Sequence, residues 1–431
     1  MGILAMGSRS GLSDGLQQTG TSLRNHVEFL ASDDLGGRLT GTTGAGKAAD
    51  YIIGQLKEIG ATPILDSGGY RLPFEFTSGI TDIGSRFFAS GNALQAPVRS
   101  REGQIRALIF SDTGQVSGPL VFAGYGITIP DNVDYPYDNF ATLDVQGKIV
   151  VVFRYMPEDV DQETRAIMGR FTDPRYKAMR ARELGAKALV VVTGPRSPNA
   201  GELVPMAFDA AAAGSGIIAA SISGDIAETL FATASAKSLR EIQEEFDTGN
   251  PHTTGFDIPD IEVTLDVKVQ RERSNGYNVV GYLPPSIPAA VERDRSYVML
   301  GAHYDHLGLG IGGNSLARGN EVGNVHNGAD DNASGVAAVL QAGSQLAAMP
   351  RERGVVLAFW SGEEFGLLGA HAFVQSEVLP ADQLAAYINF DMVGRVRDNV
   401  VTIQAVGSSD AWPSLIERTN VPIGFDIRTQ Q

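Results

Sequence analysis

The sequence predicts an α/β fold built on a mostly parallel, mixed sheet that is flanked by helices. Short apolar runs at 297–300, 355–360 and 386–390 have the length of buried strands. A helical pattern over 334–349 separates the first two of these runs. Strands that alternate with helices in this way are typical of a parallel sheet covered on both faces.

The chain has 431 residues, which is too long for one ordinary hydrophobic core, so we expect two domains. Hydrophobic residues make up 43% of it and charged residues 19%, which is the composition of a globular protein. The polar stretch 247–254 is the best candidate for a linker.

Charge and cysteine content exclude several classes of function. The formal net charge is -16, so a nucleic acid or an anionic membrane is not an expected partner, whereas a carboxylate-rich cation site is plausible. The absence of cysteine excludes disulfides, a thiol nucleophile and Cys-ligated zinc. No segment approaches the roughly 20 apolar residues of a membrane span. Residues 1–20 lack an apolar core, so no signal peptide is expected there.

Histidine and acidic residues follow the predicted strands where each strand ends. The first run leads to His303, the second to Glu363 and Glu364, and the third to Asp391. Asp330 and Asp331 stand just before the helix that begins near residue 334. In open α/β sheets, sites form beyond the carboxyl ends of the strands, so we expect these side chains to lie together.

This combination of donors suits zinc or a related divalent cation in a hydrolytic site. A two-metal site normally needs a carboxylate that bridges both ions, and Asp330 and Asp331 are the candidates. Asp305 is placed to hydrogen-bond the imidazole of His303 and hold its tautomer. Of the adjacent pair Glu363 and Glu364, one can bind metal while the other takes a proton from water.

Each feature also has a structural explanation. A single histidine in a turn is usually a surface or core residue, and acidic pairs at helix starts usually cap the helix or interact with its dipole. Such features on successive strands of one sheet favour a metal site.

The four stretches together resemble peptidase family M28, the dizinc exopeptidases, in both order and spacing. The resemblance implies that His303 and Asp391 bind one zinc, that Glu364 binds the other and that Asp331 bridges them. It further implies that Asp330 is structural, Glu363 is the general base and Asp305 orients His303. The stretches that carry it are Gly301-Ala302-His303-Tyr304-Asp305, Asn327-Gly328-Ala329-Asp330-Asp331-Asn332-Ala333-Ser334-Gly335, Ser361-Gly362-Glu363-Glu364 and Asn389-Phe390-Asp391-Met392-Val393-Gly394.

The resemblance extends to the rest of the chain. Residues 30–41 are similar to the family's N-terminal region, and the segments 121–126 and 147–152 are similar to an inserted, mainly β protease-associated (PA) domain. This implies a discontinuous peptidase domain, residues 1–85 and 270–431, interrupted by a PA-like domain over 86–269. It also implies an aminopeptidase that acts on peptides and is exported to the periplasm or the cell exterior. The preferred N-terminal residue and the oligomeric state stay open.

The family pattern differs from this sequence in its last zinc ligand, a histidine well beyond the fourth stretch. Here the only histidine after Glu364 is His371, which precedes Asp391. We therefore expect a C-terminally truncated peptidase domain that exposes apolar surface of its sheet, and a second zinc held only by Asp331 and Glu364. Two alternatives remain: a catalytically silent relative that binds a peptide or protein, and a single-zinc glutaminyl cyclase, against which the apparent PA insertion argues.

Overall fold

The computed structural model describes residues 22–64, 69–206, 215–234, 237–288, 297–310, 315–317 and 319–430. The chain divides into two compact units, the first formed by 1–76 and 275–431 and the second by 77–274. Residues 1–20, where no signal peptide is expected, lie outside the described residues. None of the helices in the described ranges is long and apolar enough to cross a membrane.

The first unit is built on a mixed sheet, as the sequence predicts. Its strands run in the order β1-β11-β13-β12-β14, and β2 also pairs with β11. Strand β12 is parallel to both β13 and β14, whereas β11 is antiparallel to β13. The strands are β1 (Thr62–Pro63), β2 (Arg71–Asp82), β11 (Val269–Leu283), β12 (Tyr297–His303), β13 (Gly354–Trp360) and β14 (Leu384–Asn389).

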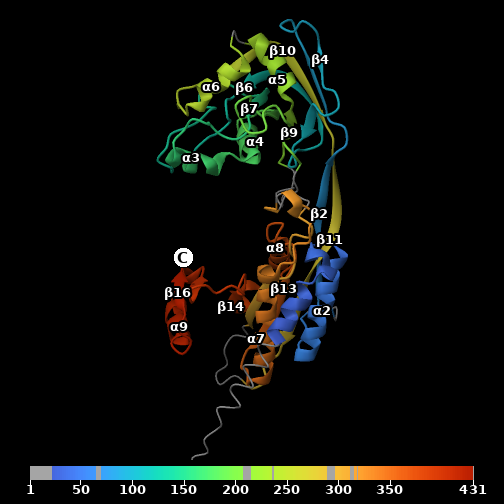
Figure 1. Cartoon of the computed structure of the whole chain (residues 1–431), viewed down its shortest axis with the longest axis vertical. Coiled ribbons are helices and arrows are strands. Elements are labelled where there is room, and N and C mark those ends of the chain that lie inside the picture. Colours follow the sequence, from blue (N-terminus) through green and yellow to red (C-terminus); the bar gives the residue numbers. More distant parts are fainter. Residues whose placement is uncertain are drawn as a thin grey trace, which may run out of the picture. The chain divides into compact units, whose positions relative to one another are not determined.

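Helices cover both faces of this sheet (Figure 1). On one face, a helix over 22–30, α2 (Thr43–Ile59) and α7 (Gly335–Ala348) enclose a core that includes Leu300, Leu357 and Phe359. On the other face, α8 (Leu368–Gln375) packs Phe373 against Trp360. Successive residues of a strand point to opposite faces, which is why β13 is apolar along its whole length and buried throughout.

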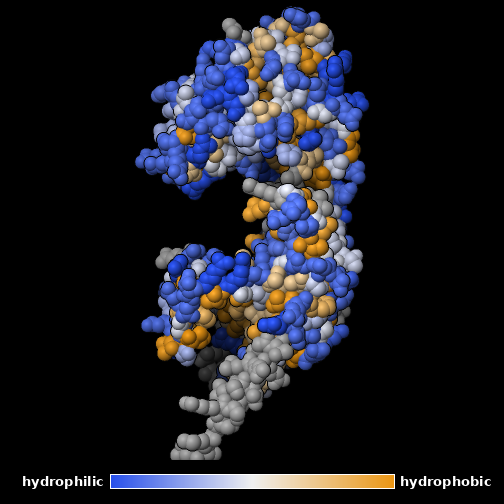
Figure 2. Space-filling view, in the orientation of Figure 1, coloured by the Kyte–Doolittle hydropathy of each residue, from blue (hydrophilic) through white to orange (hydrophobic). Residues whose placement is uncertain are grey.

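The edge strand β14 is less well covered. In the described residues it pairs only with β12, and it leaves Tyr387 and Ile388 each 39% exposed. Met392 and Val393, which follow it, are also exposed. Figure 2 shows apolar surface at this place in the first unit. The sequence after β14 forms a separate pair of parallel strands, β15 (Val400–Ile403) and β16 (Asp426–Thr429), joined by α9 (Ala411–Asn420).

The second unit contains its own mixed sheet, in the order β4-β3-β10-β6-β7-β8-β9-β5. Strands β6 to β9 are parallel to one another, and the remaining pairs are antiparallel. One hydrophobic core lies on each face. Its strands are β3 (Arg86–Ser90), β4 (Val98–Arg99), β5 (Ile105–Ala107), β6 (Gly114–Phe122), β7 (Ile149–Phe153), β8 (Ala188–Val192), β9 (Ile218–Ile222) and β10 (Phe256–Val267), and its helices are α3 (Gln162–Met168), α4 (Pro174–Glu183), α5 (Gly224–Ala234) and α6 (Leu239–Asp247).

A fully buried lysine anchors α4 in this unit. The Lys177 ammonium donates hydrogen bonds to the carbonyl oxygens of Phe153, at 3.0 Å, and Tyr155, at 2.7 Å, where β7 ends. Burial disfavours the charged form and lowers the pKa of Lys177 to about 7. The amine can therefore fasten α4 to the sheet in its neutral form, because a neutral amine still has two hydrogens to donate.

The low pKa of Lys177 predicts a pH-dependent contribution to stability. Between pH 7 and about 10 the unfolded chain binds a proton that the folded chain releases, so this residue makes the free energy of unfolding rise with pH. The slope reaches at most about 1.4 kcal/mol per pH unit. In urea titrations followed by circular dichroism, the stability of the wild type relative to Lys177→Met should increase across this range.

Lys187→Met is the matched control for this experiment, because it makes the same change at an exposed position of the same unit. If the stability difference between the wild type and Lys177→Met stays flat from pH 7 to 10, the proposed protonation difference does not exist.

Candidate metal centre

The predicted site residues of the first unit converge where three parallel strands end. His303 is the last residue of β12, Glu363 and Glu364 lie in the turn after β13, and Asp391 follows β14. Asp331 lies in the irregular turn Ala329–Ser334, directly before α7. The structure thus brings together the four residues that the family resemblance assigns to metal, namely His303, Asp331, Glu364 and Asp391.

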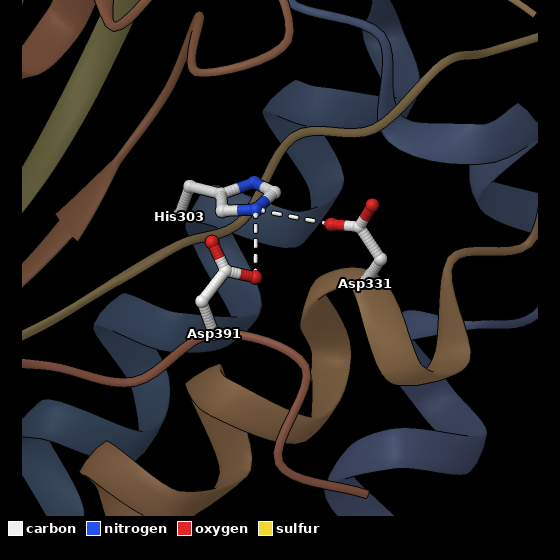
Figure 3. A group of neighbouring side chains, drawn as sticks. All are labelled: His303, Asp331 and Asp391. Atoms are coloured by element: carbon white, nitrogen blue, oxygen red, sulfur yellow. Dashed lines mark ion pairs between the residues drawn. The ribbon is translucent and has the colours of Figure 1, made fainter. Parts of the chain in front are cut away.

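One group of donors surrounds the imidazole of His303 (Figure 3). Its Nε2 lies 3.1 Å from Oδ1 of Asp331 and 3.6 Å from Oδ1 of Asp391. A carboxylate oxygen of Glu363 lies 3.9 Å from the same nitrogen. The imidazole is 2% exposed, whereas the carboxylate of Asp391 is 41% exposed. The group is therefore fixed on its protein side and open to solvent on the other.

The backbone sets the tautomer of His303. Its Nδ1 lies 3.1 Å from the carbonyl oxygen of Asp305, which can only accept a hydrogen bond. In the neutral imidazole the proton therefore sits on Nδ1, and the Nε2 lone pair points at the carboxylates. The carboxylate of Asp305, expected from the sequence to orient this ring, lies 3.7 Å from Nδ1.

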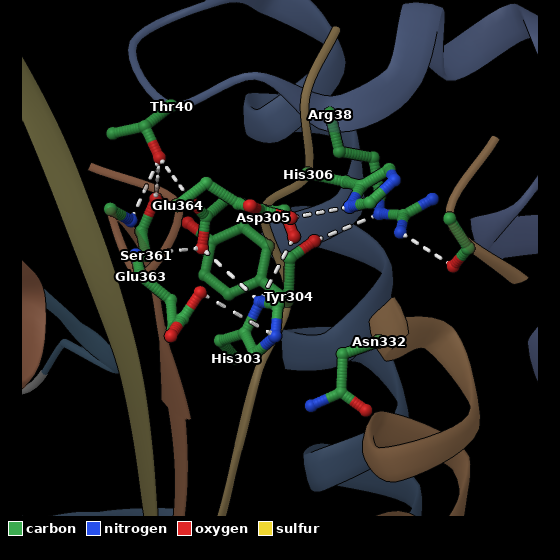
Figure 4. A network of polar contacts seen from close by, with 12 residues as sticks. Arg38, Thr40, His303, Tyr304, Asp305, His306, Asn332, Ser361, Glu363 and Glu364 are labelled. Carbon is green, nitrogen blue, oxygen red and sulfur yellow. Dashed lines mark hydrogen bonds and ion pairs between the residues drawn. The ribbon is translucent and has the colours of Figure 1, made fainter. Parts of the chain in front are cut away.

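The Asp305 carboxylate instead joins two turns of the site (Figure 4). It accepts hydrogen bonds from Oγ1 of Thr40, at 3.0 Å, and from the backbone N–H of Glu363, at 3.2 Å. The Thr40 hydroxyl is also 2.8 Å from the backbone N of Gly362 and 2.9 Å from the Ser361 hydroxyl. Thr40 and Asp305 thereby fix the turn that carries Glu363 and Glu364.

A second set of contacts ties Asp391 to the turn that holds Asp331. The Asn332 amide donates to the carbonyl oxygen of Phe390 at 2.9 Å. The Ser334 hydroxyl accepts from the backbone N–H of Val393 at 3.0 Å. Asp330 accepts from the backbone N–H of Gly394 and forms an ion pair with Arg395. Asp330 thus contacts the chain after β14 and belongs to neither donor group.

A second group of donors shares Asp331 with the first. Nδ1 of His306 lies 2.5 Å from Oε1 of Glu364 and 3.9 Å from Oδ2 of Asp331. One donor atom of each of these three residues lies within 4.8 Å of the others, as is also true of His303, Asp331 and Asp391. His306 was not predicted from the sequence as a site residue, although its position three residues after His303 places it in the same loop.

The charges at this site favour a cation. Burial alone would lower the pKa of His303, but the carboxylates of Asp305, Asp331 and Asp391 raise it to about 12. The bond to His303 in turn lowers the pKa of Asp331. Burial, together with the neighbouring acidic groups, raises the pKa of Glu363. Imidazole nitrogens and carboxylate oxygens at this spacing are donors that zinc and related ions accept, so the residues fit a divalent metal.

Arg38 is the buried cation of this region. It is 1% exposed, and it donates to the carbonyl oxygens of Tyr304, at 2.8 Å, Asn327, at 2.7 Å, and Gly328, at 3.0 Å. A further bond reaches the carbonyl oxygen of Leu30. Burial lowers its pKa to about 10, although nearby carboxylates oppose this shift, so the guanidinium is charged at neutral pH. Arg38 therefore joins the helix over 22–30 to the loops on both sides of the metal centre.

Comparison with known proteins matches two segments of the chain to known families. Residues 278–430 match the model of peptidase family M28, and residues 116–230 match the PA domain. Residues 278–430 thus form an M28 peptidase segment, and residues 116–230 form a PA-domain segment that precedes it in the sequence. Both parts of the resemblance noted in the sequence are thereby confirmed.

Individual relatives of this M28-like chain show how far the likeness extends. An aminopeptidase of Pseudomonas aeruginosa is 36% identical over 139 residues, 32% of this chain and 22% of that protein. The "Probable lipoprotein aminopeptidase LpqL" of Mycobacterium tuberculosis is 34% identical over 151 residues, 32% of this chain and 27% of that protein. The chain thus matches less than a third of the length of these two relatives.

A solved structure has a similar fold over almost the whole chain. The aminopeptidase from Aneurinibacillus sp. strain AM-1 superposes with a TM-score of 0.52 and 19% sequence identity. The match covers 95% of this chain and 80% of that one. The predicted fold class is therefore confirmed.

The contacts of Arg38 predict a large effect on stability. Arg38→Lys keeps the charge, but an ammonium cannot reproduce the guanidinium fork, so several buried carbonyl oxygens lose their partner. We expect a loss of about 3 kcal/mol or more in the free energy of unfolding. Urea titration followed by tryptophan fluorescence measures it, because Trp360 is buried in this unit.

Arg418→Lys, at an exposed position of α9, is the control and should change the stability little. If the urea-unfolding curves of the two variants have equal midpoints and slopes, Arg38 does not hold these loops together.

Proposed function

We propose that this protein is a metal-dependent aminopeptidase that removes N-terminal residues from peptides with two divalent ions, most simply zinc. The observation that carries this proposal is the position of Asp331. Its Oδ1 faces His303 at 3.1 Å, and its Oδ2 faces the second donor group. A carboxylate that presents one oxygen to each of two donor groups is the element that a two-metal site requires.

The ligands follow from the two groups. His303 and Asp391 would hold one ion, Glu364 would hold the other, and Asp331 would contact both. Bound divalent ions would polarise the scissile carbonyl and lower the pKa of a water molecule. The side chain of Asp391 is 41% exposed and that of Glu363 is 32% exposed, so a peptide has room to approach them.

Glu363 is the general base of the proposed reaction. Its carboxylate lies 3.9 Å from Nε2 of His303, beside the first donor group, and it is not a member of either donor group. Burial raises its pKa, which brings the carboxylate closer to the pH at which a base both accepts and returns a proton. Glu363 would take a proton from the attacking water and give it to the departing amine.

The turn around Glu363 supports this role. The backbone N–H of Glu363 donates to Asp305, and the N–H of Gly362 donates to Thr40, so the carboxylate projects from a fixed backbone. A general base acts only when it is held within hydrogen-bond reach of the proton it removes. Asp305 would act on the reaction through this turn and through its backbone carbonyl, which accepts from His303.

The relatives favour peptides as substrates and an exported protein. The Pseudomonas and Mycobacterium proteins are named as aminopeptidases, and the second as a lipoprotein. The PA match over 116–230 counts against the single-zinc glutaminyl cyclase that the sequence analysis left open.

Substitution of Glu363 tests the proposal directly. Glu363→Gln keeps the size of the side chain but removes the base, so hydrolysis of aminoacyl p-nitroanilides should fall by about 10²–10⁴-fold. The zinc content should be unchanged, because this residue is not among the proposed ligands. Turnover is measured by release of nitroaniline, and zinc by elemental analysis of the same samples.

Glu352→Gln, at an exposed position of the same unit, serves as the control and should keep full activity. Unchanged turnover in Glu363→Gln would remove the base assignment. A wild-type protein that binds zinc fully but cleaves no aminoacyl substrate would instead favour the silent binding protein.

A further inference from the structure

The ring nitrogen Nδ1 of His306 faces the carboxylates of Glu364 and Asp331, the other two members of the second donor group. We propose that Nδ1 of His306 is the third protein ligand of the second ion, beside Glu364 and the shared Asp331. The inference rests on the proposed two-metal function and assigns a residue that the family pattern does not supply at this position. It replaces the expectation that Asp331 and Glu364 hold this ion alone.

The fold fixes the position of the His306 ring. The backbone N–H of His306 donates to the carbonyl oxygen of Arg38 at 3.3 Å, and the N–H of Gly308 donates to that of Gly37 at 3.1 Å. A side chain on Gly328 would stand 2.6 Å from Cδ2 of His306, so the ring packs directly against this backbone. The imidazole is only 10% exposed. A ligand held in this way is preorganised before an ion arrives.

The donor atoms of this group converge as those of a metal site do. Nδ1 of His306, a carboxylate oxygen of Glu364 and one of Asp331 lie within 4.8 Å of one another. The Glu364 carboxylate is 14% exposed, so a charge on it is poorly solvated. The imidazole and this carboxylate contact each other directly at 2.5 Å, and an ion bound by both would take the place of this hydrogen bond.

None of the remaining histidines belongs to either donor group in the described residues, although the His326 ring lies 6.4 Å from the His306 ring. His26 contacts the Tyr51 hydroxyl, His326 contacts the Ser315 hydroxyl, and His371 stands on the exposed side of α8. His252 belongs to the second unit. His306 is thus the imidazole that this chain places at the second donor group.

The assignment makes the two metal sites equivalent. Each ion would have one imidazole, one carboxylate of its own and one oxygen of Asp331: His303 and Asp391 on the first, His306 and Glu364 on the second. Three protein ligands with a remaining open position are the usual set for a catalytic zinc ion. The second site would therefore hold its ion with as many protein ligands as the first.

The alternative is that His306 only orients Glu364 by a hydrogen bond. The two roles differ in the size of the effect on metal affinity. Loss of a residue that orients a ligand weakens metal binding by about 10–100-fold. Loss of a ligand should exceed that range, because the ion then keeps only Glu364 and its share of Asp331.

Metal content and affinity test the assignment in the 431-residue chain. Wild type, His306→Ala and His371→Ala are dialysed against buffered zinc, and bound zinc is counted by elemental analysis. We expect two ions per chain in the wild type and in His371→Ala, the exposed-histidine control, and one in His306→Ala. The dissociation constant of the second ion should rise by more than about 100-fold in His306→Ala, while that of the first stays within about tenfold.

Cobalt substitution gives a readout that does not depend on activity. In the cobalt-loaded protein each ligating imidazole shows one strongly shifted, exchangeable N–H proton in the NMR spectrum. The wild type should show two such signals, and His306→Ala should keep only the one from His303. If His306→Ala folds poorly by circular dichroism, His306→Gln serves in the same experiments, because its amide keeps a polar side chain at this position.

The outcomes separate this inference from the proposed function. A wild-type chain that binds no zinc or a single zinc overturns the two-metal function itself. A wild type with two ions and a His306→Ala variant that also binds two, with an affinity lowered by 100-fold or less, overturns only the role of His306 as a ligand. Two N–H signals in cobalt-loaded His306→Ala would do the same.

Discussion

The carboxylate of Asp331 is the group on which the whole metal centre depends. It lies between the imidazoles of His303 and His306 and presents a different oxygen to each. Its position is set by the turn that precedes α7, where Asn332 accepts from the backbone of Gly335 and donates to that of Phe390. A shift of this turn would move Asp331, the proposed shared ligand, and through Phe390 it would also move Asp391.

Much of the site could be predicted from the sequence, because the rule it depends on is local. A parallel strand delivers the residue after its last apolar position to the carboxyl edge of the sheet. Here β12 is parallel to both of its neighbours, and Gly301 pairs with Ala358 on one side and Asn389 on the other. The register therefore brings His303, Glu363 and Asp391 to one edge, and three apolar runs were enough to predict it.

The residues that the sequence did not reveal act through contacts between distant parts of the chain. Arg38 donates to carbonyl oxygens near residues 30, 304 and 327, and no pattern around Arg38 predicts that these will meet. Thr40 likewise contacts Asp305 and Gly362, which are far from it in the sequence. For the same reason the Asp305 carboxylate contacts Thr40 and the Glu363 backbone more closely than the imidazole that it was expected to orient. The position of His306 near His303 could be predicted from their spacing in the sequence. Its role could not, because a single histidine in a turn has many possible roles.

The balance of charge explains why the chain tolerates so many acidic groups in one place. Asp331, Asp391, Glu363 and Glu364 converge at the sheet edge, and Arg38 is already engaged by backbone carbonyls. Without an ion, the raised pKa of His303 means that a proton on the imidazole compensates part of this charge. A bound ion must displace that proton, because a ligating imidazole is neutral. The carboxylates are therefore compensated either by a protonated histidine or by a metal ion. An ion that binds only the folded chain also stabilises the fold, because its binding free energy adds to the free energy of unfolding.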